Sequence, residues 1–179
     1  MMLNNETNAE GALMYNPNEQ RKTKPKIDDI LPIYLDGDAL KNATDFVAFL
    51  RENKMSPGWR SPNSWCCSYK GKVVTYIKLG HAAYVNSEYD SWQIVFFDRY
   101  NDVGFLDENT KKIAQSKIRF CERCTNFSCA PGIKATIFNT EWEDNICCYM
   151  SLRFNNPDTD ELNCAKKLSL AHKTHIAAK

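Results

Sequence analysis

Three cysteines in one short segment place the strongest constraint on how this chain can fold. Cys121, Cys124 and Cys129 lie in the sequence Cys-Glu-Arg-Cys-Thr-Asn-Phe-Ser-Cys-Ala-Pro-Gly. Two thiolates spaced as in Cys-x-x-Cys can bind one metal ion, and Zn²⁺ takes four such ligands in a tetrahedron. We therefore expect these cysteines to share an ion with a fourth ligand from elsewhere in the chain.

A vicinal pair, Cys147 and Cys148, offers that fourth ligand. The residues around it have the composition of a strand, in which successive side chains point to opposite faces. Cys148 falls on the apolar face with Ile146 and Met150, whereas Cys147 falls on the more polar face. The predicted site is a structural zinc, with no coordination position left for water or substrate. Its ligands are Cys121, Cys124, Cys129 and Cys147.

Other roles for these cysteines stay open. The simplest alternative is a set of ordinary reduced thiols, because cysteine is often buried as a small hydrophobe. Cys121 and Cys124 could instead form a redox pair, since Arg119 and Arg123 nearby would favour a thiolate. A thioredoxin-like pair, however, belongs at a helix N-terminus after a strand, and here it follows a predicted helix. The common ferredoxin spacings are absent.

Composition limits the class of protein. The chain has 179 residues, of which 43% are hydrophobic, enough for one domain with a core. Its net charge of +1 argues against nucleic acid or an acidic membrane as partner. No apolar run approaches the roughly 20 residues that span a bilayer. The Asn-rich start has no apolar core of a signal peptide, so we expect a cytoplasmic protein with reduced thiols.

The periodicity of apolar residues predicts an α+β fold. Residues 1–26 are predicted to form a flexible polar arm, and residues 27–179 a single α+β domain. The expected layout is one antiparallel sheet of about five strands, with helices packed on one face and a Cys-rich loop. Helices are predicted at 39–55, 107–118 and after Asp158, which has capping-box spacing to Glu161. Strands are predicted at 65–69, 73–79, 91–98, 133–138 and 145–154, with a polar turn at 139–144.

Smaller features of the chain lead to further expectations. Lys70-Gly71 should form a hairpin turn. Cys66 and Cys67 should place one thiol on each face of a strand. The tail from His172 onward should fray, which makes His172 and His175 solvated residues rather than a ligand pair.

Aromatic residues of the strand region suggest a binding surface. Most should be core, but an uncovered part of the sheet would expose rings with Tyr hydroxyls at the rim, as in a small-molecule site. The candidate ligand-binding residues are Trp65, Tyr69, Tyr76 and Trp92. No catalytic triad or Gly-rich phosphate loop can be assembled. We therefore expect a non-enzymatic domain that binds a small molecule or a protein partner. The alternative is a thiol-dependent redox or metal-handling enzyme that uses Cys121 and Cys124.

The order of the motifs resembles that of a known group of proteins. The stretch from Trp65 to Gly80, the cysteine segment followed by Thr136-Ile-Phe138, and Asn156-Pro-Asp158 leading into a helix carry the likeness. Together they resemble small, uncharacterised Cys-bearing proteins of anaerobic bacteria, over roughly residues 38 to 172. The resemblance implies no function.

Overall fold

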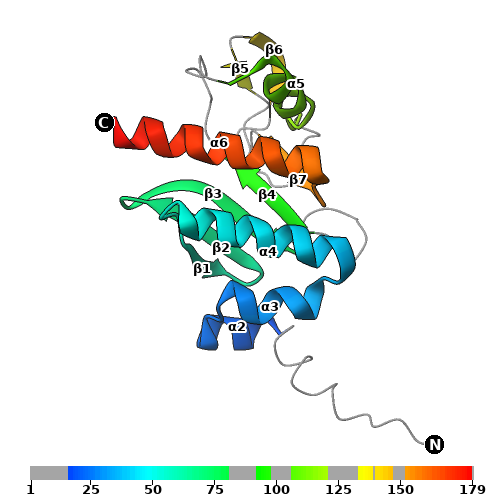
Figure 1. Cartoon of the computed structure of the whole chain (residues 1–179), viewed down its shortest axis with the longest axis vertical. Coiled ribbons are helices and arrows are strands. Elements are labelled where there is room, and N and C mark those ends of the chain that lie inside the picture. Colours follow the sequence, from blue (N-terminus) through cyan, green and yellow to red (C-terminus); the bar gives the residue numbers. More distant parts are fainter. Residues whose placement is uncertain are drawn as a thin grey trace, which may run out of the picture.

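Five helices and seven strands form within the residues that the computed structural model describes. Those residues are 16–80, 92–97, 106–120, 133–138, 140–146 and 152–178. A five-stranded sheet occupies the middle of the molecule (Figure 1). Helix α5 and a two-stranded sheet lie at one end, and helix α2 lies at the other.

The main sheet has the strand order β1-β2-β3-β4-β7, and each neighbouring pair is antiparallel. Its strands are β1 (Pro57–Ser61), β2 (Ser64–Tyr69), β3 (Lys72–Leu79), β4 (Trp92–Phe96) and β7 (Leu152–Asn155). In the β2–β3 turn, Lys70 and Gly71 both have positive φ, as a type I′ hairpin requires. The predicted α+β class, antiparallel sheet and hairpin are confirmed.

One row of large side chains crosses the whole main sheet. The register aligns, strand by strand, Trp59, Trp65, Ile77, Ile94 and Phe154. All but the half-buried Trp59 are buried. Burying each such side chain stabilises the fold by about 1.5–3 kcal/mol. This row therefore marks the core face of the sheet. In each strand, the residues directly before and after a member of the row point to the opposite face.

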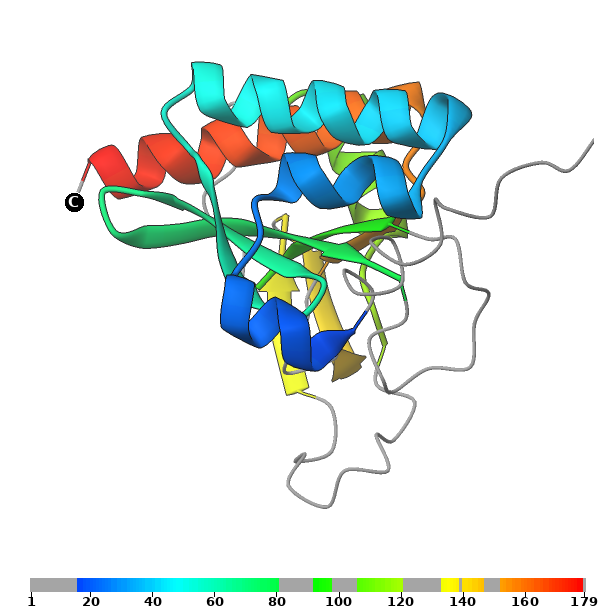
Figure 2. The same ribbon diagram turned by 90° about the horizontal axis from the view of Figure 1, so that it is seen from below.

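Helices α4 (Gly37–Glu52) and α6 (Thr159–Ala177) lie side by side over the core face (Figures 1 and 2). Asp45 of α4 forms an ion pair with Lys166 of α6. The predicted apolar face of α4 is confirmed, because the residues at helical spacing are buried. They are Ala43, Phe46, Val47 and Leu50.

The sequence makes a prediction about each end of α6: a cap at Asp158 and a frayed tail from His172. The predicted cap is confirmed, since the Asp158 carboxylate accepts a hydrogen bond from the Glu161 N–H at 2.9 Å. The expectation of a frayed tail is wrong, because the helix continues to Ala177. His172 is only 8% exposed, and its Nδ1 lies 3.0 Å from the Val74 carbonyl oxygen. Packing against β3 keeps this part of the chain helical.

The N-terminal part of the described chain, within the predicted arm, contains a helix. Helix α2 (Pro17–Thr23) falls inside residues 1–26, and helix α3 (Ile27–Tyr34) follows it. Residues 1–15 lie outside the described residues. Pro25 accepts a hydrogen bond through its carbonyl from Trp65 Nε1 at 3.1 Å. The segment before α3 is therefore fastened to the rest of the fold at Pro25 and at the buried Gln20, although most of its other described residues are exposed.

A second sheet departs from the predicted layout. It pairs β5 (Ile133–Ile137) with β6 (Thr140–Ile146), separately from the main sheet. Residues 118–120 link the two sheets, through isolated bridges from Ile118 to Leu152 and from Phe120 to Ile146. Helix α5 (Glu108–Ser116) precedes this link.

The differences in strand assignment have physical causes. The expected single sheet is wrong for residues 133–138, because their partner is the adjacent segment 140–146. Most of the expected turn at 139–144 is therefore strand, with half-buried Trp142 paired opposite Ala135. Strand β1 was not predicted, since Pro57 and Gly58 read as a helix stop. The predicted strand 145–154 overlaps the end of β6 and the first three residues of β7.

Candidate functional site

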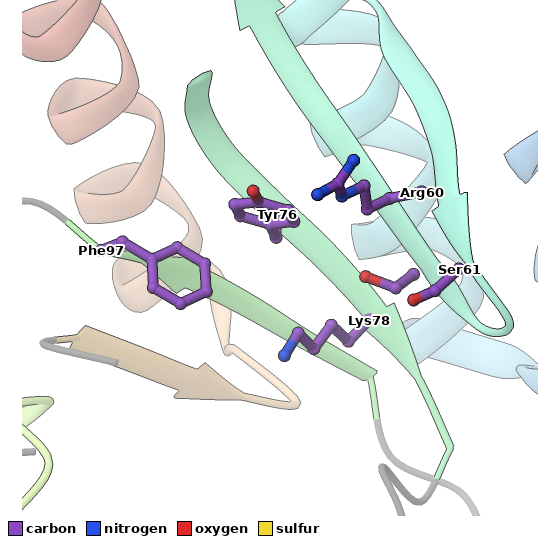
Figure 3. A pocket seen from close by; sticks show the side chains of 6 residues that line it. Arg60, Ser61, Tyr76, Lys78 and Phe97 are labelled. Carbon is purple, nitrogen blue, oxygen red and sulfur yellow. The ribbon is translucent and has the colours of Figure 1, made fainter. Parts of the chain in front are cut away.

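A pocket lies on the face of the main sheet opposite the core row; we call this the pocket face. Its volume is about 330 Å³. Figure 3 shows the side chains that line it. The strand periodicity explains its position, because Tyr76 and Lys78 flank the core residue Ile77 in β3. Phe97 directly follows β4. The lining residues are Arg60, Ser61, Ser64, Tyr76, Lys78 and Phe97.

Two aromatic rings form one wall of the pocket. The Tyr76 and Phe97 ring centroids are 4.7 Å apart, and the planes meet at 78° in an edge-to-face contact. Lys78 Nζ lies 6.0 Å from the Phe97 centroid. Ser61 and Ser64 flank the β1–β2 turn on the other side. Ring surface and hydrogen-bonding groups therefore converge on the same small volume.

The described lining residues of the pocket include two cations. Arg60 and Lys78 line it, and none of the six described lining residues is acidic. Burial lowers the pKa of the Lys78 ammonium, and the nearby positive charges of Arg153 and Arg119 lower it further. Arg153 shares the pocket face, because the register aligns it with Val95 and Tyr76. Four cationic side chains therefore lie in or near the pocket.

The structure separates the four aromatic residues predicted to bind a ligand. Trp65 and Trp92 are 1% and 0% exposed and belong to the core beneath the helices. Tyr69 lies near α6, with Lys173 Nζ 5.3 Å from its ring centroid. Tyr76 alone of the four lines the pocket. Aromatic content did not distinguish these positions, because strand parity and helix cover decide which ring is accessible.

Sequence reasoning missed most of the pocket. Arg60, Ser61 and Ser64 belong to β1 and to the start of β2, and β1 was not predicted. Lys78 and Phe97 carried a usable signal, since each lies one residue from a core position in a predicted strand. Strand alternation alone would have assigned both to the side opposite the core.

The predicted metal ligands Cys121, Cys124, Cys129 and Cys147 lie outside the described residues. Among the described residues, no three His, Cys, Asp or Glu side chains gather where they could hold a metal ion. The zinc site therefore stays a prediction.

The vicinal cysteines of β2 match their prediction. Cys67 is fully buried on the core face, and this burial raises the pKa of its thiol. Cys66 points to the pocket face, where its Sγ lies 3.9 Å from Ser68 Oγ. One thiol therefore lies on each side of the strand.

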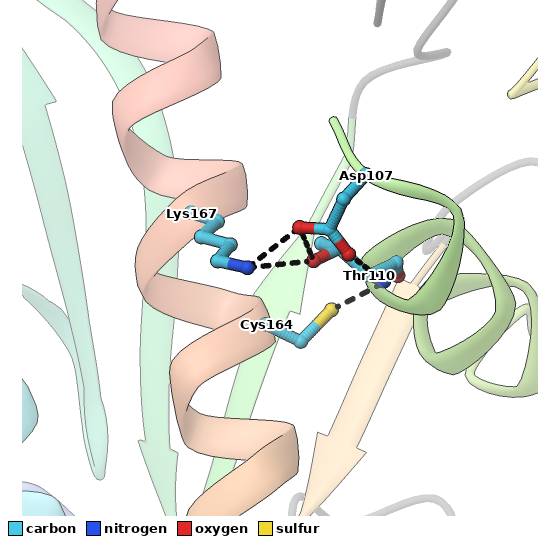
Figure 4. A network of polar contacts seen from close by, with 4 residues as sticks. All are labelled: Asp107, Thr110, Cys164 and Lys167. Carbon is cyan, nitrogen blue, oxygen red and sulfur yellow. Dashed lines mark hydrogen bonds and ion pairs between the residues drawn. The ribbon is translucent and has the colours of Figure 1, made fainter. Parts of the chain in front are cut away.

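A polar network joins α5 to α6 (Figure 4). The Asp107 carboxylate caps α5 by accepting from the Thr110 N–H at 2.8 Å, and Lys167 Nζ donates to it at 2.6 Å. Cys164 Sγ donates to the Thr110 carbonyl at 3.4 Å, and burial raises the pKa of this thiol to about 12. These groups satisfy one another, so the network holds two helices together.

No family model, no curated protein and no solved structure matches this chain. Within the described residues, no helix combines the length and apolar character needed to cross a membrane. Evidence for a function therefore comes from the residues that line the pocket.

Proposed function

We propose that this protein is a binding domain that holds a small organic molecule in the pocket of the main sheet. The observation that carries the proposal is the convergence of ring surface, hydroxyl groups and cationic groups from three strands on about 330 Å³. Small-molecule sites have this make-up, an apolar wall with a few placed polar groups, and volumes from about 300 Å³ upward. The pocket would suit a ligand of modest size.

The position of the pocket supports binding by a preformed surface. Tyr76 and Lys78 project from β3, which is paired on both sides within the sheet. Ile77, which lies between them, belongs to the core row, so the spacing of the two side chains is set by the backbone. Side chains held on strands lose less freedom on binding than side chains on loops. The pocket would therefore need little rearrangement to accept a ligand.

A thermal-shift screen of small aromatic compounds tests the proposal. A compound present at a hundred times its dissociation constant adds about 2.7 kcal/mol of stability. For a chain of this size we expect a rise in melting temperature of about 5–10 °C. Tyr76→Ala should abolish the shift. Tyr69→Ala is the matched control, since Tyr69 is also half-buried but lies outside the pocket.

Each shift is measured relative to the melting temperature of the same variant without compound. The proposal fails if no compound in the screen produces a shift. It fails equally if Tyr76→Ala keeps the full shift, because the compound would then bind elsewhere.

A further inference from the structure

We propose that the buried Ser64 hydroxyl anchors the ligand of this pocket, and that the ligand is an aryl carbonyl compound whose oxygen accepts a hydrogen bond from that hydroxyl. The inference rests on the proposed function, since it names the ligand class and the specificity-determining residue of the same pocket. The burial of Ser64 argues for the hydrogen bond, and the register of β2 and β3 argues for the size of the ligand.

Ser64 is a polar residue that lines the pocket and is nevertheless only 8% exposed. Within the described part of the chain, its hydroxyl has no hydrogen-bond partner. Buried side-chain hydroxyls in folded proteins are usually hydrogen-bonded, because a polar group that leaves water without a partner costs free energy. A ligand oxygen in the pocket would supply the partner that the described residues do not.

The polar groups around Ser64 favour an acceptor as this partner. Ser61 pairs with Ser64 in the β1–β2 register, and both residues line the pocket. Arg60 lines it as well, and a guanidinium carries donors only. A serine hydroxyl can also donate, and a carbonyl oxygen can accept through two lone pairs. A carbonyl oxygen therefore suits this end of the pocket better than an N–H group, to which Arg60 could not bond.

The register sets the distance between Ser64 and the aromatic wall. Ser64 pairs with Lys78 in the β2–β3 register. Tyr76 lies two residues before Lys78 in the same strand, so Ser64 and Tyr76 are diagonal neighbours on the pocket face. Diagonal neighbours in an antiparallel pair are about 7–8 Å apart. A carbonyl group bonded directly to an aromatic ring fits this span, with its oxygen at the Ser64 hydroxyl and its ring beside Tyr76.

Two compounds of nearly the same shape isolate the hydrogen bond in a calorimetric titration of the full chain. Acetophenone carries the carbonyl oxygen, and α-methylstyrene has a methylene group in its place. We expect acetophenone to bind about tenfold tighter, because only its oxygen can accept a hydrogen bond from Ser64. Tyr76→Ala should weaken the binding of both compounds, since both place a ring beside Tyr76.

A substitution of Ser64 ties this preference to one hydroxyl. Ser64→Ala should weaken acetophenone binding about tenfold and leave α-methylstyrene binding unchanged. Ser68→Ala is the matched control, because Ser68 lies in the same strand, is half-buried and is not among the described residues that line the pocket. Without compound, Ser64→Ala should melt no lower than wild type, since it removes a buried hydroxyl that has no partner among the described residues. A marked fall in its melting temperature would assign Ser64 a structural role and contradict the inference.

The binding results separate the inference from the proposed function. Equal affinity for the two compounds, lost in Tyr76→Ala, would overturn the inference and leave an aromatic site that requires no carbonyl group. A preference for acetophenone that survives Ser64→Ala would overturn it as well, because another group would then be the donor. If neither compound binds, the inference falls, and a thermal shift by other compounds that Tyr76→Ala abolishes would still support the proposed function.

Discussion

Gln20 and Asn63 exchange two hydrogen bonds across 43 residues of sequence. Gln20 Nε2 donates to Asn63 Oδ1 at 2.6 Å, and the Asn63 backbone N–H donates to Gln20 Oε1 at 2.8 Å. Asn63 lies in the β1–β2 turn with a φ of 56°. The pair therefore fastens helix α2 to the edge of the sheet that carries Arg60 and Ser61.

Gln20→Ala should destabilise the protein by about 1–3 kcal/mol, because it leaves the turn N–H without its acceptor in a partly buried place. Urea denaturation measures this change in the free energy of unfolding. Arg21→Ala in the same helix is the control, since Arg21 is exposed and its guanidinium donates to the exposed Asn18 of the same helix. Equal stability of the two variants would show that α2 contributes nothing through this contact.

Asp107→Asn should lower the free energy of unfolding at neutral pH, and should lower it much less at acidic pH. Hydrogen bonds from Lys167 and then from Thr110 hold the pKa of the Asp107 carboxyl well below its usual range. A lowered pKa in the folded state stabilises the protein at pH values above the unfolded value of about 3.9. That stabilisation is lost as the pH falls from there toward the folded pKa.

The check is the difference in free energy of unfolding between wild type and Asp107→Asn, measured at pH 7 and pH 3. We expect the difference to shrink at pH 3. Glu108→Gln is the control, because Glu108 is 81% exposed and pairs with Lys111 of the same helix. A difference that is constant with pH would contradict the assigned role of the carboxylate.

Lys78→Gln should raise the stability of the ligand-free protein at neutral pH. Burial, followed by the charges of Arg153 and Arg119, lowers the pKa of Lys78, so the folded state disfavours its charged form. This cost is present in full below the folded pKa and disappears as the pH rises through it toward the unfolded value of about 10.4. The gain from the substitution should shrink over the same window.

Thermal melts of wild type and Lys78→Gln between pH 7 and pH 10.5 measure this effect, with Lys72→Gln as reference. The prediction is wrong if Lys78→Gln is the less stable protein at pH 7.

Native protein purified without added metal should contain about one equivalent of zinc by elemental analysis. The matched pair Cys147→Ser and Cys148→Ser tests the ligand set. The first should lose the metal and the second should keep it, since only one parity of the strand can face the ion. Metal-free protein with a thiol that alkylates rapidly near neutral pH would favour the redox alternative for Cys121 and Cys124.

The sequence by itself determined the elements whose signals are local. The apolar spacing of residues 43–50 predicts α4, Asp158 predicts the start of α6, and Lys70-Gly71 predicts the hairpin turn. Each depends on backbone geometry within a few residues. The alternation of side chains along a strand likewise assigns Cys66 and Cys67 to opposite faces.

Only the tertiary structure decided which faces are covered and which distant residues meet. Strand alternation shows that the two sides of a strand differ, but it does not show which side the helices cover. It therefore does not distinguish Trp65, buried beneath helices, from Tyr76 on the pocket face. Residues 133–137 pair with 140–146 and not with an edge strand of the main sheet, and the local sequence does not decide between these two partners. The pocket likewise exists because pairing of β1, β2, β3 and β4 aligns side chains from residues 60 to 97. Contacts of this kind depend on chain topology, which sequence periodicity does not specify.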